Sequence, residues 1–440
     1  FKQKTAYEIR PRDWSSDVCS SDLFPTRDVR IPNRGTPPPW SGDLDITSEE
    51  LSEVARRLGA ARKAPGPDGV PGRVWALVFG EVGAGIQMGP NVTRILYDWG
   101  LQTALQPWAV QPQALIACDA RSGHEVGQLN LHDVHLRYGA PYLTIHRADL
   151  HELLRTLLNP EQVQICLGRT LDHIEVHDGG IPWACDTHGA SHTARALIGV
   201  DGLWSRVRQQ IWHCPPAQAS GHWAYRALLP TRLLSPRWRL PEVRVWMAPG
   251  LHAVHYPVRG GQWLNLVLLV ESDGRDLTQG WDVLRDPQQI QADVQRALRG
   301  LCHDLQDVVR SVEQWRAWVL SDRPPLRCAA EMARGPVALL GDAAHPMLPY
   351  LAQGAGMAIE DARQLEHCLA ERGATDLPGV LAAYAQARWR RNARVQNQAR
   401  RNGRIFHADG PLAWARNAAL RMAAPRLMDQ PWLYAHGLVG

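Results

Sequence analysis

The sequence predicts an α/β protein that combines an open α/β sheet with an inserted, mostly antiparallel sheet. Residues 335–369, GPVALLGDAAHPMLPYLAQGAGMAIEDARQLEHCL, read as a buried strand, a small-residue turn and a long amphipathic helix. A second strand ends at Asp201-Gly202 and leads into a short helix. Between residues 221 and 271 the pattern changes to successive strands separated by turn residues. These three observations indicate two domains, one of them interrupted by the other.

Composition narrows the class of protein. At 440 residues, with 45% hydrophobic and 21% charged residues, the chain resembles a soluble globular protein of two domains. No apolar run reaches the roughly 18 residues of a membrane span, and the opening FKQKTAYEIR lacks the apolar stretch of a secretory signal. A net charge of +4 is too small to indicate nucleic acid as a partner. Eight scattered cysteines without a CxxC pair fit reduced thiols in a cytoplasmic protein better than disulfides or a zinc site.

Residues 1–78 are expected to form an unrelated, poorly ordered extension. Residues 2–23 have no helical or strand period and resemble translated sequencing adapter, and residues 36–42 are Pro-rich like a linker. The string KAPGPDGVPGRVW at 63–75 resembles a fragment of retrotransposon reverse transcriptases, but no catalytic carboxylate pair follows it. We therefore expect this region to contribute nothing to activity.

Short helices and strands follow the extension. The predicted elements are a helix over 91–101, a hairpin over 112–131, a strand over 142–146 that leads into a helix over 147–158, and strands over 163–168, 173–177 and 193–200. The last strand ends in DGLWSRVR, where Ser205 is placed to cap a helix that runs through Ile211.

The middle block is predicted to be a sheet, and helices follow it. Its elements are strands over 223–229, 243–247, 251–258 and 263–271 with a turn at 259–262, helices over 287–298 and 303–312, and a strand over 315–320 that returns to the first domain. A long helix over 381–404 carries seven arginines and no acid. A solvated helix face explains this run better than nucleic-acid binding does.

Several residues are placed where a ligand would lie. Ligands of open α/β sheets bind beyond the carboxyl ends of strands, which is where Asp342 emerges. The glycine-rich helix start at residues 354–356 lets backbone amides approach a negatively charged group. Arg147, at a strand–helix junction, can bind a pyrophosphate or instead pair with Asp149 or Glu152. Residues 83–85, GAG, are only a weak dinucleotide fingerprint, because the third glycine is missing.

Three strings together resemble the FAD-dependent aromatic hydroxylases, most closely the salicylate hydroxylase type. They are GDAAHPMLPYLAQGAGMAIEDA, HRADL and DGLWSRVR, and the resemblance extends over about residues 81–440. It implies a Rossmann-like FAD-binding domain at 79–212 and 320–404, a substrate domain at 213–319 and a helical tail at 405–440. It also implies FAD as cofactor, NAD(P)H and O2 as co-substrates, a small phenolic or aryl carboxylate substrate, and a possible homodimer.

The resemblance also implies roles for particular residues. The cofactor-binding candidates are Gly83, Ala84, Gly85, Arg147, Asp201, Gly202, Arg208, Gly341, Asp342, Pro349, Gly354, Ala355 and Gly356. His222 is the candidate base that draws the phenolic proton, with Tyr225 as the second choice. Arg226, His255 and Tyr256 are the candidates for substrate binding. Since side chains alternate along strands, each of these could instead face solvent or the core.

One element that the family requires is missing from the sequence. Such hydroxylases open with a buried strand, GxGxxG, a helix and an acidic residue that hold the cofactor's pyrophosphate and ribose, and none of these precedes Glu81. The Rossmann-like domain is therefore expected to be incomplete at its N-terminus. The alternative to an active hydroxylase is a non-functional truncated chimera that cannot hold FAD.

Overall fold

The computed structural model describes residues 85–440, except 178, 273–285 and 437–440. The predicted N-terminal extension, together with Gly83 and Ala84, lies outside the described residues. Among the described helices, none is both long and apolar enough to cross a membrane.

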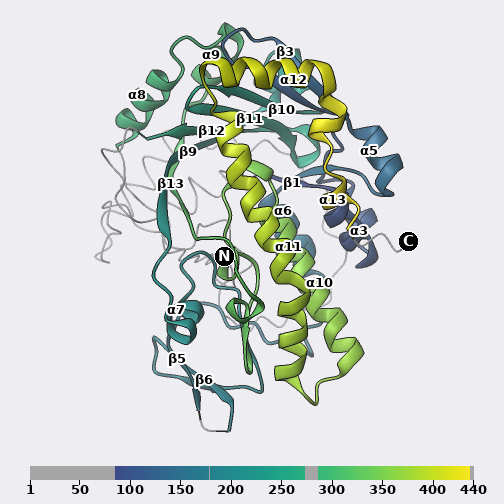
Figure 1. Cartoon of the computed structure of the whole chain (residues 1–440), viewed down its shortest axis with the longest axis vertical. Helices are drawn as coiled ribbons and strands as arrows, with labels where there is room; N and C mark the ends of the chain where they lie inside the picture. Colours follow the sequence, from purple (N-terminus) through teal and green to yellow (C-terminus); the bar gives the residue numbers. More distant parts are fainter. Residues whose placement is uncertain (1–84, 178, 273–285, 437–440) are drawn as a thin grey trace, which may run out of the picture.

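A large seven-stranded sheet dominates one end of the molecule (Figure 1). Its strands, in spatial order, are β13 (Arg316–Asp322), β9 (Gln218–Pro230), β12 (Trp263–Glu271), β11 (Leu251–Val258), β10 (Glu242–Ala248), β2 (Ala114–Asp119) and β3 (Glu125–Asn130). All neighbours are antiparallel except β10 and β2, which are parallel. The predicted antiparallel block and its hairpin turn are thus confirmed. The strand expected to return to the first domain is β13, which pairs with β9 at the edge of this sheet.

Three smaller sheets complete the β-structure of the described residues. They are β1 (Gly85–Met88) with β4 (Leu143–His146); β14 (Ala333–Arg334), β15 (Val337–Leu339) and β8 (Leu197–Gly199); and β5 (Leu171–His177), β6 (Ile181–Asp186) and β7 (Ser191–Thr193). β15 and β8 are parallel, as expected for strands of an open α/β sheet. The strand predicted over 163–168 is absent, since those residues form turns and coil that are largely exposed, and β6 was not predicted. The predicted domain boundaries stay a prediction.

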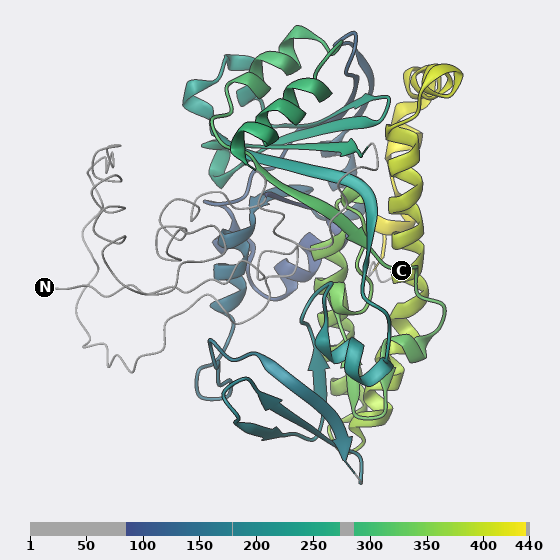
Figure 2. The same cartoon turned by 90° about the vertical axis from the view of Figure 1, so that its left-hand side faces the viewer.

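The described residues also form helices, of which α11 (Leu377–Phe406) is the longest. They are α3 (Pro90–Asp98), α4 (Gln102–Leu105), α5 (Leu131–Tyr138), α6 (Arg147–Arg155), α7 (Arg206–Trp212), α8 (Pro287–Ala297), α9 (His303–Arg310), α10 (Gly354–Arg372), α11 (Leu377–Phe406), α12 (Gly410–Met428) and α13 (Pro431–Tyr434). α11 runs from the small sheets to the large sheet, with α10 beside its first half (Figures 1 and 2).

Both faces of the large sheet are buried, and this decides which of its side chains can reach a ligand. α8 and α9 cover the outer face through an apolar core that includes Trp223, Leu266 and Leu305. On the inner face, Leu348 and Tyr350 of the loop after β15 pack against Ala224 and Leu269. The segment predicted to bind the cofactor therefore lies against the inner face of the sheet.

Candidate active site

The turn after β15 is held tightly against α10. Gly341 has a φ of 55°, and a Cβ there would lie 3.1 Å from the Cβ of Ala358, so a glycine suits this position in both respects. Its N–H donates to Oδ2 of Asp361 at 3.1 Å. Asp342 Oδ1 lies 3.9 Å from the position that a Cβ on Gly354 would occupy. The carboxylate of Asp342 therefore lies beside the first turn of α10.

The N-terminus of α10 is a second candidate for contact with a ligand. Its N-cap residue, Gln353, makes no capping hydrogen bond, and the first turn contains no acidic residue. The backbone amides of a first helical turn have no intrahelical partner and carry partial positive charge. Gly356 serves packing instead, because a Cβ there would lie 2.8 Å from Cγ2 of Val92 on α3. This terminus suits an electronegative edge of a ligand.

The DG motif is joined to this turn by a buried arginine. Ser205 Oγ accepts from the N–H of Arg208 at 2.9 Å, which confirms the predicted helix cap. Asp201 caps the same helix, since its Oδ2 accepts from the N–H of Arg206 at 2.7 Å. The Arg208 guanidinium donates to the carbonyls of Ala343, at 3.2 Å, and Ala344. Asp201 and Arg208 thus bond to backbone groups of α7 and of the turn, Gly202 has a φ of 74°, and contact of these residues with the cofactor stays a prediction.

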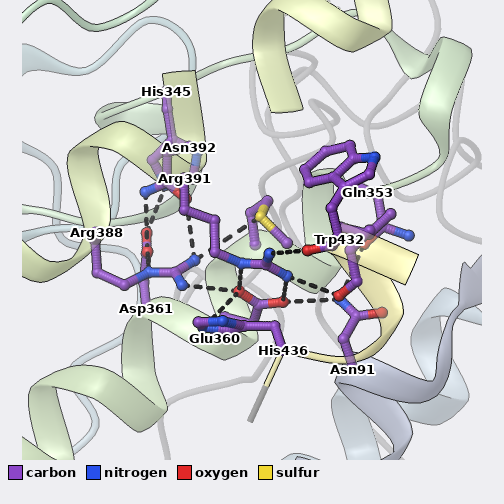
Figure 3. A network of polar contacts seen from close by, with 12 residues as sticks. Asn91, His345, Gln353, Glu360, Asp361, Arg388, Arg391, Asn392, Trp432 and His436 are labelled. Atoms are coloured by element: carbon purple, nitrogen blue, oxygen red, sulfur yellow. Dashed lines mark hydrogen bonds and ion pairs between the residues drawn. The ribbon is translucent and has the colours of Figure 1, made fainter. Parts of the chain in front are cut away.

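A buried ionic network fixes α10 and α11 together behind the turn (Figure 3). Arg388 donates from Nε to Asp361 Oδ1 and from Nη1 to Glu360 Oε2, each at 2.7 Å. Arg391 binds both oxygens of Glu360, at 2.6 and 2.7 Å. His345 bonds Asp361 and Asn91 Nδ2 donates to Glu360 Oε1 at 2.7 Å, so the network also holds the turn and α3.

The prediction that the arginines of α11 lie on a solvated helix face is wrong for two of them. Arg388 is 1% exposed and Arg391 is largely buried, so these two do not lie on a solvated face. Our sequence reading missed Glu360, Asp361, Arg388 and Arg391 as determinants of the site. The available signal was the acidic pair within α10 opposite an acid-free run of arginines on α11.

The network also lowers the pKa values of its two carboxyl groups. Burial favours the neutral form of Glu360, but hydrogen bonds from Arg391 and the charge of Arg388 outweigh it and lower the pKa from 4.5 to about 2. Burial likewise opposes ionisation of Asp361, yet His345 and Arg388 hold its pKa well below the usual range.

Because the pKa of Glu360 is lowered by folding, we expect the free energy of unfolding to fall at acidic pH. Because the folded-state pKa of Glu360 is lowered, its stabilisation is complete above pH 4.5 and is lost as the pH falls towards about 2. The loss amounts to about 3 kcal/mol in the free energy of unfolding. Glu360→Gln should flatten that part of the pH profile in urea unfolding, whereas Glu371→Gln, on the exposed side of α10, should not. Parallel profiles for the parent and Glu360→Gln would contradict the assignment.

The residues predicted to contact the substrate lie on two different faces of the large sheet. His222, Arg226 and Tyr256 lie on the inner face, as do Ala224 and Val258 of the same strands, which pack in inner-face clusters. Tyr225 is buried in the outer core with Trp223. His255 packs against Trp238 and Trp246 on the outer side, at ring distances of 4.7 and 6.2 Å. Strand alternation thus places Tyr225 and His255 on the outer face, and their roles towards the substrate stay predictions that this placement does not support.

Arg226 is the most distinctive inner-face group. Its guanidinium lies 5.0 Å from the ring centre of Trp318, and its Nε is buried without a hydrogen-bond partner. Burial lowers its pKa to about 10; the phenol of Tyr256 opposes the shift and the charge of Arg147 adds to it. Two arginines within electrostatic reach of each other on a partly buried surface favour binding of an anion.

His222 lies at the other end of β9, in a cluster of polar side chains. Its Nδ1 is 3.3 Å from Ser220 Oγ and its Nε2 is 3.8 Å from Glu271 Oε1. Burial lowers its pKa, although the charge of Glu271 opposes this shift. The imidazole is therefore neutral near pH 7 and could accept a proton at Nε2.

Three further residues predicted to bind the cofactor belong to segments near the inner face of the large sheet. Gly85 opens β1, donates its N–H to Asn265 Oδ1 at 3.0 Å, and would place a Cβ 2.6 Å from the Tyr256 ring. Arg147 begins α6 directly after β4. Pro349 begins the short 3-10 turn that packs Tyr350 onto the sheet. The structure thus gathers these residues around the inner face, while their roles stay predictions.

Comparison with known proteins identifies the family. A family model described as an FAD binding domain matches residues 132–399. The 3-hydroxybenzoate 6-hydroxylase of Polaromonas naphthalenivorans (strain CJ2) is 34% identical over 360 residues, covering 81% of this chain and 87% of that protein. The 3-amino-4-hydroxybenzoate 2-monooxygenase PtmB3 of Streptomyces platensis is 34% identical over 363 residues, covering 82% and 88%.

Solved structures show the same fold. A salicylate hydroxylase substrate complex matches with a TM-score of 0.67 at 23% identity, covering 81% of this chain and 88% of that one. Klebsiella pneumoniae HpxO complexed with FAD and uric acid matches with a TM-score of 0.67 at 22% identity, covering 81% and 87%. The fold is therefore that of the flavin-dependent hydroxylases. By its sequence the chain belongs to the FAD-dependent aromatic hydroxylases, a family of flavin monooxygenases whose cofactor is FAD.

Proposed function

We propose that this protein hydroxylates a small aromatic substrate carrying a phenolic or carboxylate group, using NAD(P)H and O2. The observation that carries the substrate class is Arg226, whose Nε is buried without a partner on the inner face of the sheet, near Arg147. Relatives named for hydroxybenzoate chemistry support the same class.

The residues around the turn fit a flavin cofactor. Asp342 offers a carboxylate to a hydroxyl of the ribityl chain, and the amides of Gly354 and Ala355 offer donors to an electronegative edge. Arg147 offers a guanidinium for the pyrophosphate. When bound, FAD supplies the redox chemistry that activates O2, which protein side chains cannot do.

The chain's own side chains then have three tasks. Arg226 orients the substrate by pairing with its carboxylate or phenolate. His222 Nε2 takes the phenolic proton, which raises the electron density of the ring. Leu348 and Tyr350, packed against the inner face of the sheet, exclude water from one side of the site.

Arg226→Met tests the substrate assignment. Loss of one charge-assisted pair should lower kcat/KM for a hydroxybenzoate about 10- to 100-fold. The matching phenol without a carboxylate should be affected much less. Steady-state oxidation of NAD(P)H, with hydroxylated product quantified by chromatography, measures both. A control variant, Arg237→Met, changes an exposed arginine that pairs with Asp304 and should leave both substrates unaffected. Equal losses for the two substrates in Arg226→Met would overturn the role of Arg226.

We also propose a cytoplasmic location and leave a homodimer as a possibility. The support for the location is that all seven described cysteines have free thiols, as expected in a reducing compartment.

A further inference from the structure

The end of α11 meets the large sheet (Figure 1), where the N–H of Gly250 donates to the carbonyl of His407 at 3.1 Å. Three side chains of the types that bind metal ions lie close together at this junction. This cluster comprises His222 of β9, Glu271 at the end of β12, and His407 directly after α11. One ligand atom from each of the three lies within 4.8 Å of the other two, and no second such group occurs in the part of the chain that the structure describes. These residues are remote in sequence, so the fold itself brings them together.

The individual distances show which atoms face one another. His407 Nδ1 lies 3.0 Å from Glu271 Oε1, and His222 Nε2 lies 3.8 Å from the same oxygen. The other nitrogen of His222 contacts Ser220 Oγ at 3.3 Å. The other nitrogen of His407 lies 2.7 Å from His252 Nδ1. Each histidine thus turns one nitrogen to the shared carboxylate and holds the other in an outer hydrogen bond, as metal-bound histidines do.

The side chain of Tyr350 gives a second, independent observation beside this cluster. Tyr350 is 4% exposed, and its hydroxyl is buried without a hydrogen-bond partner. Its ring packs against those of His222, His252 and His407, with centres 5.7, 5.2 and 5.8 Å away. A buried hydroxyl without a partner is costly, so a ligand at the cluster, or water bound to it, would satisfy this group.

We propose that His222, Glu271 and His407 bind a divalent transition-metal ion of the Zn²⁺ class. Two imidazole nitrogens and one carboxylate form a donor set typical of zinc sites that keep a further position for water. Ligand atoms around Zn²⁺ sit about 2.0–2.2 Å from the ion, so the three groups need to close in only modestly. The side chain of Glu271 is 51% exposed, which gives the ion a path from solvent.

This site goes beyond the proposed hydroxylation and limits it. A metal ion on His222 Nε2 occupies the lone pair that would otherwise accept the substrate proton. The ion-bound and proton-accepting forms of His222 therefore exclude each other in one molecule. Binding itself does not depend on the proposed function, because it is measured without substrate or turnover.

Co²⁺ titration of the untagged full chain, stripped of metal by a chelator and dialysed, tests the proposal. We expect one equivalent of Co²⁺ to bind, with the visible ligand-field absorption of a low-coordinate site, and Zn²⁺ to displace it. Glu271→Gln, which alters a half-exposed side chain, should weaken binding at least about ten-fold. His252→Phe, which removes only the outer partner of His407, should weaken it about 10- to 100-fold.

The matched control uses a second histidine pair on the surface. His173 and His177 both lie close to Glu175 on β5, at 3.4 and 2.5 Å, but all three are exposed. His177→Ala should leave the Co²⁺ stoichiometry and affinity unchanged. The proposal is overturned if the parent chain binds no Co²⁺, if Glu271→Gln binds as tightly as the parent, or if His177→Ala abolishes binding.

Discussion

Replacing Arg388 by alanine should lower the free energy of unfolding by about 3–5 kcal/mol, the range observed when one partner of a buried ion pair is removed. The guanidinium binds Asp361 and Glu360 at 2.7 Å each, and both carboxylates are almost completely buried. Without Arg388, Asp361 would lose its arginine partner and keep its hydrogen bond with His345, while Glu360 would rely on Arg391. The loss exceeds that of a surface mutation because buried charge remains unpaired.

Urea unfolding followed by circular dichroism measures this effect. Arg390→Ala, two positions along the same helix, removes an exposed arginine that lies over Trp389 and should change stability by less than about 0.5 kcal/mol. Similar losses for the two variants would show that the buried network does not hold α10 against α11.

Asp342→Ala should weaken FAD binding about 10- to 100-fold, the equivalent of one charge-assisted hydrogen bond. The carboxylate lies beside the first turn of α10, with Oδ1 3.9 Å from the position that a Cβ on Gly354 would occupy. Its removal takes away the proposed partner of a ribityl hydroxyl while leaving the network behind the turn intact. Fluorescence of released flavin during equilibrium dialysis gives the dissociation constant.

Arg394→Ala is the control for this prediction. Arg394 is exposed on α11 and stacks on Trp432 at 4.1 Å, away from the turn. Flavin affinity should match that of the parent chain. An equal loss in the two variants would count against Asp342 as a cofactor contact.

Much of the fold could be predicted because local patterns and tertiary structure agree. The strand and helix around Asp342 and the cap at Ser205 carry their own signals, as do the strands of the middle block. The prediction of a strand over 163–168 was wrong because the apolar residues there are largely exposed and join no sheet. Periodicity alone does not say whether a partner strand exists.

The candidate site was harder to predict because both faces of the large sheet are covered. Alternation places Tyr225 and Arg226 on opposite faces but does not say which face meets the cofactor domain. Only the packing of α8 and α9 against the outer face shows that Tyr225 and His255 lie on the opposite face of the sheet from Arg226. Similarly, an arginine run looks the same in sequence whether its members face solvent or, like Arg388, a buried carboxylate.

The missing GxGxxG unit makes cofactor retention the central question. The residues around Asp342, Gly354 and Arg147 fit FAD, yet no GxGxxG motif precedes Glu81 in the printed sequence. The visible absorption spectrum of the purified full chain, before and after incubation with FAD and gel filtration, tests the account most directly. We predict the absorption bands of bound flavin in stoichiometric amount. A colourless protein that takes up no FAD would contradict the account and favour the alternative of a chain that cannot hold the cofactor.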